Sequence, residues 1–257
     1  MIILILKIAS LFIIFLTGIL GGLSPLRRSL SEKGRRNLML GNAFAGGIFL
    51  GAGLLHMLPD AVDNFNTLKP HIDFPYPMLI AGLGFLLVLL IDQIGSNSTG
   101  DNNDPQDKGP VYPLILFLVL SLHSIIAGTS LGLEGVAISA LAIFLAIIAH
   151  KGAAGFALGV SLSKNEYSRT RHIRTIILFA AMTPLGVLLG TFFSTILSGN
   201  DAMAFEMIFD SLAAGTFLYI AIAEIMNEVF ENHEDMLRKM TFTVAGFALM
   251  ALIAVWT

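Results

Sequence analysis

The 257-residue sequence has no cysteine, one tryptophan and only 13% charged residues. Without cysteine the chain forms neither a disulfide framework nor a thiolate metal site, so a bound metal would meet nitrogen or oxygen ligands. Because 55% of the residues are hydrophobic and the mean hydropathy is +0.81, the few charged side chains cannot cover a water-facing surface. The composition therefore indicates an integral membrane protein. The formal net charge of −3 is too small to indicate a nucleic-acid partner.

Apolar runs divide the chain into eight expected transmembrane helices, because a helix satisfies its own backbone groups in lipid. The spans are expected at residues 2–24, 39–60, 75–94, 111–135, 136–162, 174–198, 206–230 and 238–257. Glu134 and Gly135 separate the fourth span from the fifth, since one helix over both would be nearly twice as long as the bilayer is thick. We predict an all-α, polytopic membrane bundle in which residues 1–257 form a single transmembrane domain.

The basic residues lie mostly on one side of these spans. Twelve of the 15 lie in or beside loops that follow odd-numbered spans: Arg27, Arg28, Lys33, Arg35, Arg36, Lys108, Lys164, Arg169, Arg171, Arg174, Arg238 and Lys239. Basic loops stay in the cytoplasm, so both termini are expected outside and the polar loop 95–110 is expected on the cytoplasmic side. That loop is rich in Asp, Asn and Gly and is predicted to be flexible.

Two histidines, His123 and His150, lie near the middle of the fourth and fifth spans. Ionisable side chains are costly at this depth, so they indicate a polar site or pathway. Each lies twelve residues from the cytoplasmic end of its span, which places both about 18 Å into the membrane at ~1.5 Å per residue. A single histidine can be a hydrogen-bonding residue between helices, but two at matched depth favour a site for zinc or a similar divalent metal.

The residues that follow each histidine are small. Gly128 and Gly132 form one small-xxx-small pair, and Gly155 and Gly159 form another. Such pairs let helix backbones pack tightly. We therefore expect the fourth and fifth helices to approach each other closely through these glycines.

Other polar side chains suggest a route to the histidines. His56 and Asp60 are spaced i, i+4, so they share one face near the outer end of the second span. Asp63 and Glu134 are expected at a similar outer level, where the four side chains can collect cations as an entrance. Glu224 lies inside the seventh span, and a buried carboxylate needs a partner, so a metal-binding role is expected for it. The acidic residues that follow it, from Glu228 onward, are expected to be solvated at a helix end.

Several motifs resemble those of a known family. HSIIAGTSLGL (123–133) resembles the fourth-helix signature of the ZIP family of divalent-metal transporters, His-Ser-x-x-Glu-Gly-x-x-x-Gly, and HKGAAGFALG (150–159) resembles the fifth-helix His-Lys motif of one ZIP branch. Three further segments resemble the second, sixth and seventh helices of the family: LLHMLPDA (54–61), TPLGVLLG (183–190) and GTFLYIAIAEIMNE (215–228), in that order. These matches occur in family order and extend over most of the chain.

The resemblance implies a 3+2+3 arrangement in which the first and last three helices are inverted repeats around the fourth and fifth. It also implies secondary transport of a divalent metal, above all zinc, into the cytosol, and a location in the plasma membrane rather than an internal membrane. Carried over by motif, His123 and His150 are nitrogen ligands and Ser124 is an oxygen ligand. Zn²⁺ or another divalent metal is then the substrate rather than a cofactor, and no cofactor is expected. The expected partners are the metal ion, the lipid bilayer and, as an open alternative, a second copy in a homodimer.

One position departs from the family signature. Ala127 stands where the family has a glutamate, four residues after the first histidine. Without that carboxylate the site loses a hard oxygen ligand and a negative charge that would offset a dication. An alternative is therefore a transport-deficient, ZIP-like membrane protein with a regulatory or assembly role.

Enzymatic classes find no support in the motifs. The sequence has no H-E-x-x-H motif of a metalloprotease and no G-x-x-x-x-G-K-[ST] loop to bind the nucleotide of an ATP-driven pump. We expect no enzyme activity.

Overall fold

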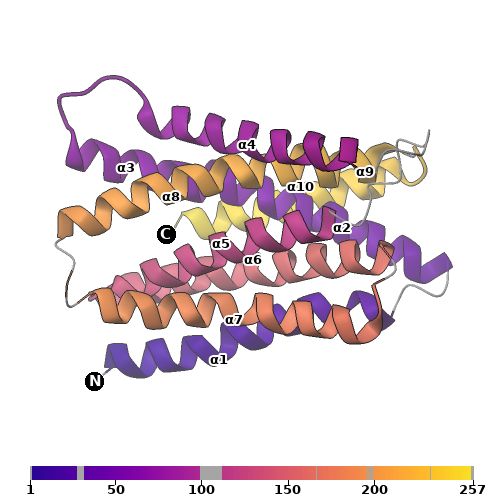
Figure 1. The fold of residues 1–257 in the computed structure, drawn as a ribbon, viewed down its shortest axis with the longest axis horizontal. Coiled ribbons are helices and arrows are strands. Elements are labelled where there is room, and N and C mark those ends of the chain that lie inside the picture. Colours follow the sequence, from indigo (N-terminus) through magenta and orange to yellow (C-terminus); the bar gives the residue numbers. More distant parts are fainter. Residues whose placement is uncertain are drawn as a thin grey trace.

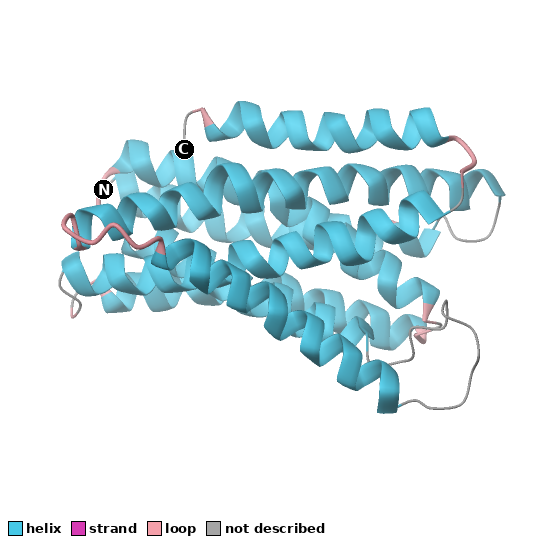
Figure 2. Ribbon diagram, turned by 90° about the horizontal axis from the view of Figure 1, so that it is seen from above, coloured by secondary structure: helices cyan, strands magenta, loops and turns pink. Residues whose placement is uncertain are grey.

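The computed structural model describes residues 2–27, 32–98, 112–165, 167–194, 196, 199–231 and 233–255 (Figure 1). Every regular element in this part of the chain is a helix, and eight of the helical segments are long and apolar enough to cross a membrane. The helices run alongside one another as an elongated bundle (Figure 2). The predicted all-α bundle of eight spans is confirmed.

The helices follow the expected order along the chain. They are α1 (Ile2–Leu23), α2 (Glu32–Ala52), η2 (Gly53–Met57), α3 (Leu58–Leu68), α4 (Tyr76–Ser98), α5 (Tyr112–Leu133), α6 (Ala137–Lys164), α7 (Arg169–Phe193), α8 (Gly199–Tyr219), η3 (Ile220–Met226), α9 (Asn227–Glu231) and α10 (Met236–Ala254). The predicted break near Glu134 is confirmed, because α5 ends one residue before it. The predicted loop 95–110 begins later than expected, since α4 continues to Ser98, and its residues 99–110 lie outside the described part of the chain.

The second and seventh spans differ most from the prediction. The second is continuous over residues 32–68 instead of 39–60, and the seventh over 199–231 instead of 206–230. Hydropathy detects only the apolar part of a helix, so the more polar turns at the ends of these two helices were not predicted. Each of these two spans also contains one π-helical segment, η2 or η3. Such insertions are frequent at functional sites, and these two hold His56 and Glu224.

The helices form two groups of four spans. One group contains α1, α5, α6 and α7, and the other contains α2 with α3, α4, α8 with α9, and α10. The main contact between the groups joins α2 to α6. Phe49 of α2, Leu158 of α6 and Phe217 of α8 are all buried in the hydrophobic core where the groups meet.

Glycines set the closest approaches, but between partners other than the expected ones. A Cβ on Gly128 of α5 would lie 2.2 Å from the carbonyl oxygen of Thr183 on α7, and one on Gly155 of α6 would lie 2.6 Å from that of Gly18 on α1. The prediction that these glycines bring the fourth and fifth helices together is therefore wrong. Each helix instead packs its glycine face against a parallel helix, which is not its neighbour in sequence.

The predicted inverted-repeat arrangement stays a prediction. The pairing of α5 with α7 and of α1 with α6 describes which helices touch, and it does not establish a symmetry relation between the first and last three spans.

Candidate metal site

His123 of α5 and His150 of α6 face each other at mid-length of their helices. Their Nε2 atoms are 3.3 Å apart, and the ring centroids are 5.3 Å apart at an angle of 58°. Both side chains are buried, with 5% and 3% of their surfaces exposed. Two imidazole nitrogens bound to one tetrahedral zinc ion at 2.0–2.1 Å would be separated by about 3.3 Å. The 3.3 Å separation is a hydrogen-bond distance between the two imidazoles, and it also matches the spacing of two ligands on a single ion.

Phe217 of α8 packs against both rings from the other helix group. Its centroid lies 4.4 Å from that of His123 and 6.0 Å from that of His150. Phe217 is fully buried and makes an edge contact of 4.8 Å with Phe49 of α2. The histidine pair thus lies at the boundary between the two helix groups.

A polar cavity of about 480 Å³ leads to the two histidines from the end of the bundle where α5 joins α6. We call this end the mouth end. Besides His123 and His150, the cavity is lined by the polar side chains of His56, Asp60, Asp63, Asn64, Ser130, Glu134, Ser139, Glu206 and Asp210. All the residues expected at an entrance therefore line one cavity, and His56 Nδ1 lies 2.8 Å from Asp60 Oδ2, as their i, i+4 spacing predicts.

Glu206 and Asp210 of α8 were missed by the sequence analysis. Both residues lie within the span expected at residues 206–230, but no role was assigned to them. With α8 starting at Gly199, they lie one turn apart inside a long apolar helix and line the cavity. The available signal was their i, i+4 spacing within FEMIFDSL, the same pattern that identified His56 and Asp60.

The position of the absent family glutamate faces the cavity. Ala127 lies one turn from His123 on α5, toward the mouth end, and lines the cavity wall together with Ser130. A longer acidic side chain at residue 127 would therefore point into the space above the two imidazole rings. The departure from the family signature affects the site directly.

Ser124, the third predicted ligand, is engaged elsewhere. Lys151 Nζ donates a hydrogen bond of 2.9 Å to Ser124 Oγ and another of 3.2 Å to the carbonyl oxygen of Phe179. The ammonium also lies 3.8 Å from the centroid of the Phe179 ring, and Lys151 is 2% exposed. Neither Lys151 nor Ser124 is among the residues that line the cavity.

Glu224, the fourth predicted ligand, is also away from the histidines. It is buried in η3, and its Oε1 lies 3.4 Å from the hydroxyl of Tyr219, which donates a 2.9 Å hydrogen bond to Asp92 Oδ2. Among the residues that the structure describes, no group of three or more His, Asp or Glu side chains is close enough to hold a metal together. The structure thus brings together His123 and His150 from the predicted ligand set, and leaves Ser124 and Glu224 outside it.

These features define a class: a multi-pass helical membrane protein whose acidic cavity reaches two histidines inside the bundle. Comparison with known proteins identifies the family within this class. The family model described as ZIP zinc transporter matches residues 4–113 and 96–254, so the chain belongs to the ZIP zinc transporter family. The resemblance seen in the motifs is confirmed.

Two zinc transporters match over most of their length, and a third relative matches over a shorter part. Zinc transporter ZIP2 of Mus musculus is 29% identical over 266 residues, which cover 86% of each chain. Zinc transporter ZIP1 of the same species is 30% identical over 292 residues, 95% of this chain and 89% of the relative. Protein zntD of Dictyostelium discoideum is 34% identical over 150 residues, 57% of this chain and 22% of the relative.

Proposed function

We propose that the chain transports a divalent metal ion, with zinc as its main substrate, across the membrane into the cytosol. His123 and His150 bind the ion near mid-membrane during this passage. The observation that carries the proposal is the 3.3 Å separation of their Nε2 atoms at the end of the acidic cavity. Membership of the ZIP zinc transporter family and similarity to proteins named zinc transporters support the same conclusion.

The cavity supplies the negative charge that the histidine pair lacks. Five carboxylate side chains line it, namely Asp60, Asp63, Glu134, Glu206 and Asp210. A cleft lined by charges of one sign raises the local concentration of counter-ions, so these groups attract dications toward the rings. With Ala127 in place of a glutamate, the ion is held by neutral imidazoles and water. We infer that binding at the pair is weak and that release is correspondingly fast.

The basic loops support the proposed direction of transport through the orientation that they indicate. The asymmetry of lysine and arginine supports an orientation with both termini and the mouth end outside, and with residues 95–110 in the cytoplasm. Metal entering from the mouth end then leaves into the cytosol. A plasma-membrane location and assembly as a homodimer accompany this proposal as expectations from the family resemblance.

Uptake of radioactive zinc into proteoliposomes tests the proposal. Liposomes that contain the intact chain should take up more zinc than empty liposomes. His123→Ala combined with His150→Ala should reduce this excess uptake at least ~10-fold, because removing even a side chain that only supports a metal ligand lowers metal affinity or activity by that factor. Uptake by the intact chain that equals empty liposomes would overturn the proposal and favour the transport-deficient, ZIP-like alternative.

A further inference from the structure

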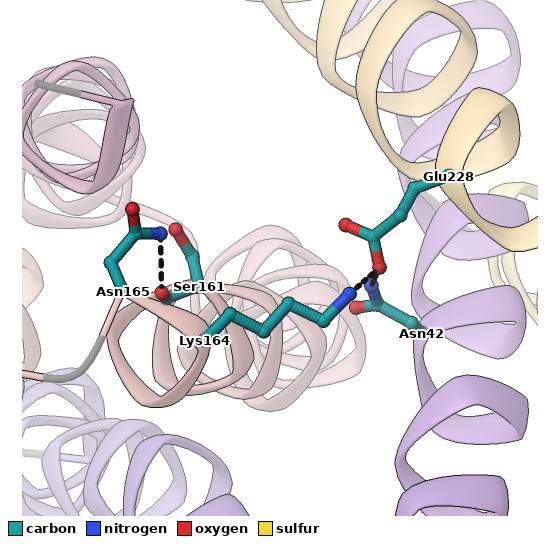
Figure 3. A network of polar contacts seen from close by, with 5 residues as sticks. All are labelled: Asn42, Ser161, Lys164, Asn165 and Glu228. Atoms are coloured by element: carbon teal, nitrogen blue, oxygen red, sulfur yellow. Dashed lines mark hydrogen bonds and ion pairs between the residues drawn. The ribbon is translucent and has the colours of Figure 1, made fainter. Parts of the chain in front are cut away.

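An ion pair joins the two helix groups at the end of the bundle opposite the cavity. Lys164, the last residue of α6, reaches across to the carboxylate of Glu228 on α9 and contacts its Oε1 (Figure 3). Asn42 of α2 donates a hydrogen bond of 3.5 Å from its Nδ2 to the same oxygen. Lys164 belongs to one helix group, and Asn42 and Glu228 belong to the other.

This cluster is well separated from the histidine pair. Lys164 follows His150 by fourteen positions along α6, a rise of about 21 Å. The cavity is lined by α6 only as far as His150, and beyond it Ala154, Leu158 and Leu162 are buried in the core. An ion that passes the histidines must therefore emerge along this closed segment, toward the end where Lys164 and Glu228 meet.

Three side chains that carry oxygen atoms, Asn42, Ser163 and Glu228, line one cavity with Lys164. Asn42 is 5% exposed, and its Oδ1 atom is buried without a hydrogen-bond partner among the described residues. A cavity of about 320 Å³ is lined by Asn42, Glu228, Lys164 and Ser163, and the Ser163 Oγ atom is also buried and unpartnered in this part of the chain. Carboxylate and amide oxygens are ordinary ligands for divalent cations. The lysine ammonium stands where such a cation would bind.

We propose that Glu228 and Asn42 form an exit site for the transported dication, and that Lys164 competes with the metal for it. This inference rests on the proposed transport function. In the conformation seen here the ammonium occupies the site and holds the two helix groups together. An arriving dication displaces Lys164 from Glu228, and the lysine returns when the metal leaves.

The exposure and charge of the side chains at the exit site favour brief binding of the dication rather than tight retention. The side chains of Lys164 and Glu228 are 52% and 36% exposed, and exposed ion pairs are weak, so displacement of the lysine costs little. The exposed Arg35 lines the same cavity and adds a second positive charge. Two cations beside one carboxylate favour rapid release of a bound dication.

Metal binding in the absence of the central histidines tests the site. In purified chain carrying His123→Ala and His150→Ala, Cd²⁺ binding is measured by equilibrium dialysis in lipid nanodiscs. Lys164→Met removes the competing charge and should add one bound equivalent, or tighten binding at least ~10-fold. Lys164→Arg keeps the charge at similar length and should leave Cd²⁺ binding unchanged, so it is the matched control.

Removal of the oxygen ligands completes the test. Adding Glu228→Gln to the Lys164→Met variant should abolish the gain, and Asn42→Ala should do the same if Glu228→Gln does not yield folded protein. The inference is overturned if Lys164→Met binds no more Cd²⁺ than Lys164→Arg, or if the gain survives loss of both ligands. Because the histidines are absent, this failure differs from a failure of the intact chain to take up zinc.

Discussion

Lys151 and Ser124 join α6 to α5 through a buried hydrogen bond of 2.9 Å, one residue beyond each histidine of the pair. The two histidine rings and this lysine–serine contact therefore bridge the same two helices side by side. The lysine ammonium is occupied by Ser124 and by the carbonyl of Phe179, so it is held outside the cavity that leads to the rings. A cation next to the proposed metal site is thereby kept from the path of the incoming ion.

Replacement of Lys151 by methionine should destabilise the protein. The hydroxyl of Ser124 and the carbonyl of Phe179 both lose their lysine donor, and a buried group left unsatisfied costs about 1–3 kcal/mol. Thermal unfolding in detergent measures the effect. Ser124→Ala should cost less, since Lys151 still donates to Phe179. Equal stability of Lys151→Met and the unmodified chain would contradict the bridging role.

Restoring the carboxylate with Ala127→Glu should strengthen zinc binding. Residue 127 lines the cavity one turn from His123, and attraction between a carboxylate and a dication is strong where water is scarce. We expect binding at least ~10-fold tighter, which corresponds to ~1.4 kcal/mol. Titration calorimetry measures it, with Ala127→Gln as the uncharged control of similar size. Equal zinc binding by Ala127→Glu and Ala127→Gln would show that the negative charge at residue 127 does not strengthen binding.

The carboxylates missed in the sequence should govern capture of the ion. Asp210→Asn should raise the KM for zinc uptake several-fold and leave kcat nearly unchanged, because the residue lines the cavity that leads to the histidine pair. The combination with Glu206→Gln should raise KM further, and added salt should shrink both effects. Asp73→Asn, at an exposed residue outside the cavity, is the matched control. A fall in kcat with constant KM would instead place Asp210 in a later step.

Two glycine-to-alanine substitutions compare the effect of close helix packing on stability with the effect of helix propensity. In Gly128→Ala the new Cβ would meet the Thr183 carbonyl oxygen at 2.2 Å, so α5 and α7 must move apart. We expect a loss of at least ~1–3 kcal/mol, as for other overpacked cores, and a lower melting temperature. Gly82→Ala on α4 meets nothing within 4 Å and should be neutral or stabilise by up to about 1 kcal/mol. Similar effects of both changes would show that Gly128 is not a packing residue.

Which side chains lie close to one another could be predicted from the sequence only in part, because most such contacts depend on the tertiary structure. The i, i+4 spacing of His56 and Asp60 was enough to place them on one face, and the structure finds them in contact. Glu206 and Asp210 have the same spacing, but no site was predicted from it, and the structure places both on the cavity wall. Ser124 was expected as an oxygen ligand from the family motif, and the structure shows its hydroxyl bound to Lys151, because the next residue on a helix points about 100° away from His123.

By itself the sequence determined the number of spans, the position of His123 and His150 near the middle of their helices, and the family, because hydropathy and sequence motifs are local properties that do not depend on the fold. Tertiary structure alone decided which faces meet. It paired the glycines of α5 with α7 and those of α6 with α1, assembled five carboxylates from two spans and the turn after α5 around one cavity, and turned Lys151 toward Ser124. The rotation of each helix about its axis is set by packing against partners far away in the chain, and no local pattern encodes it.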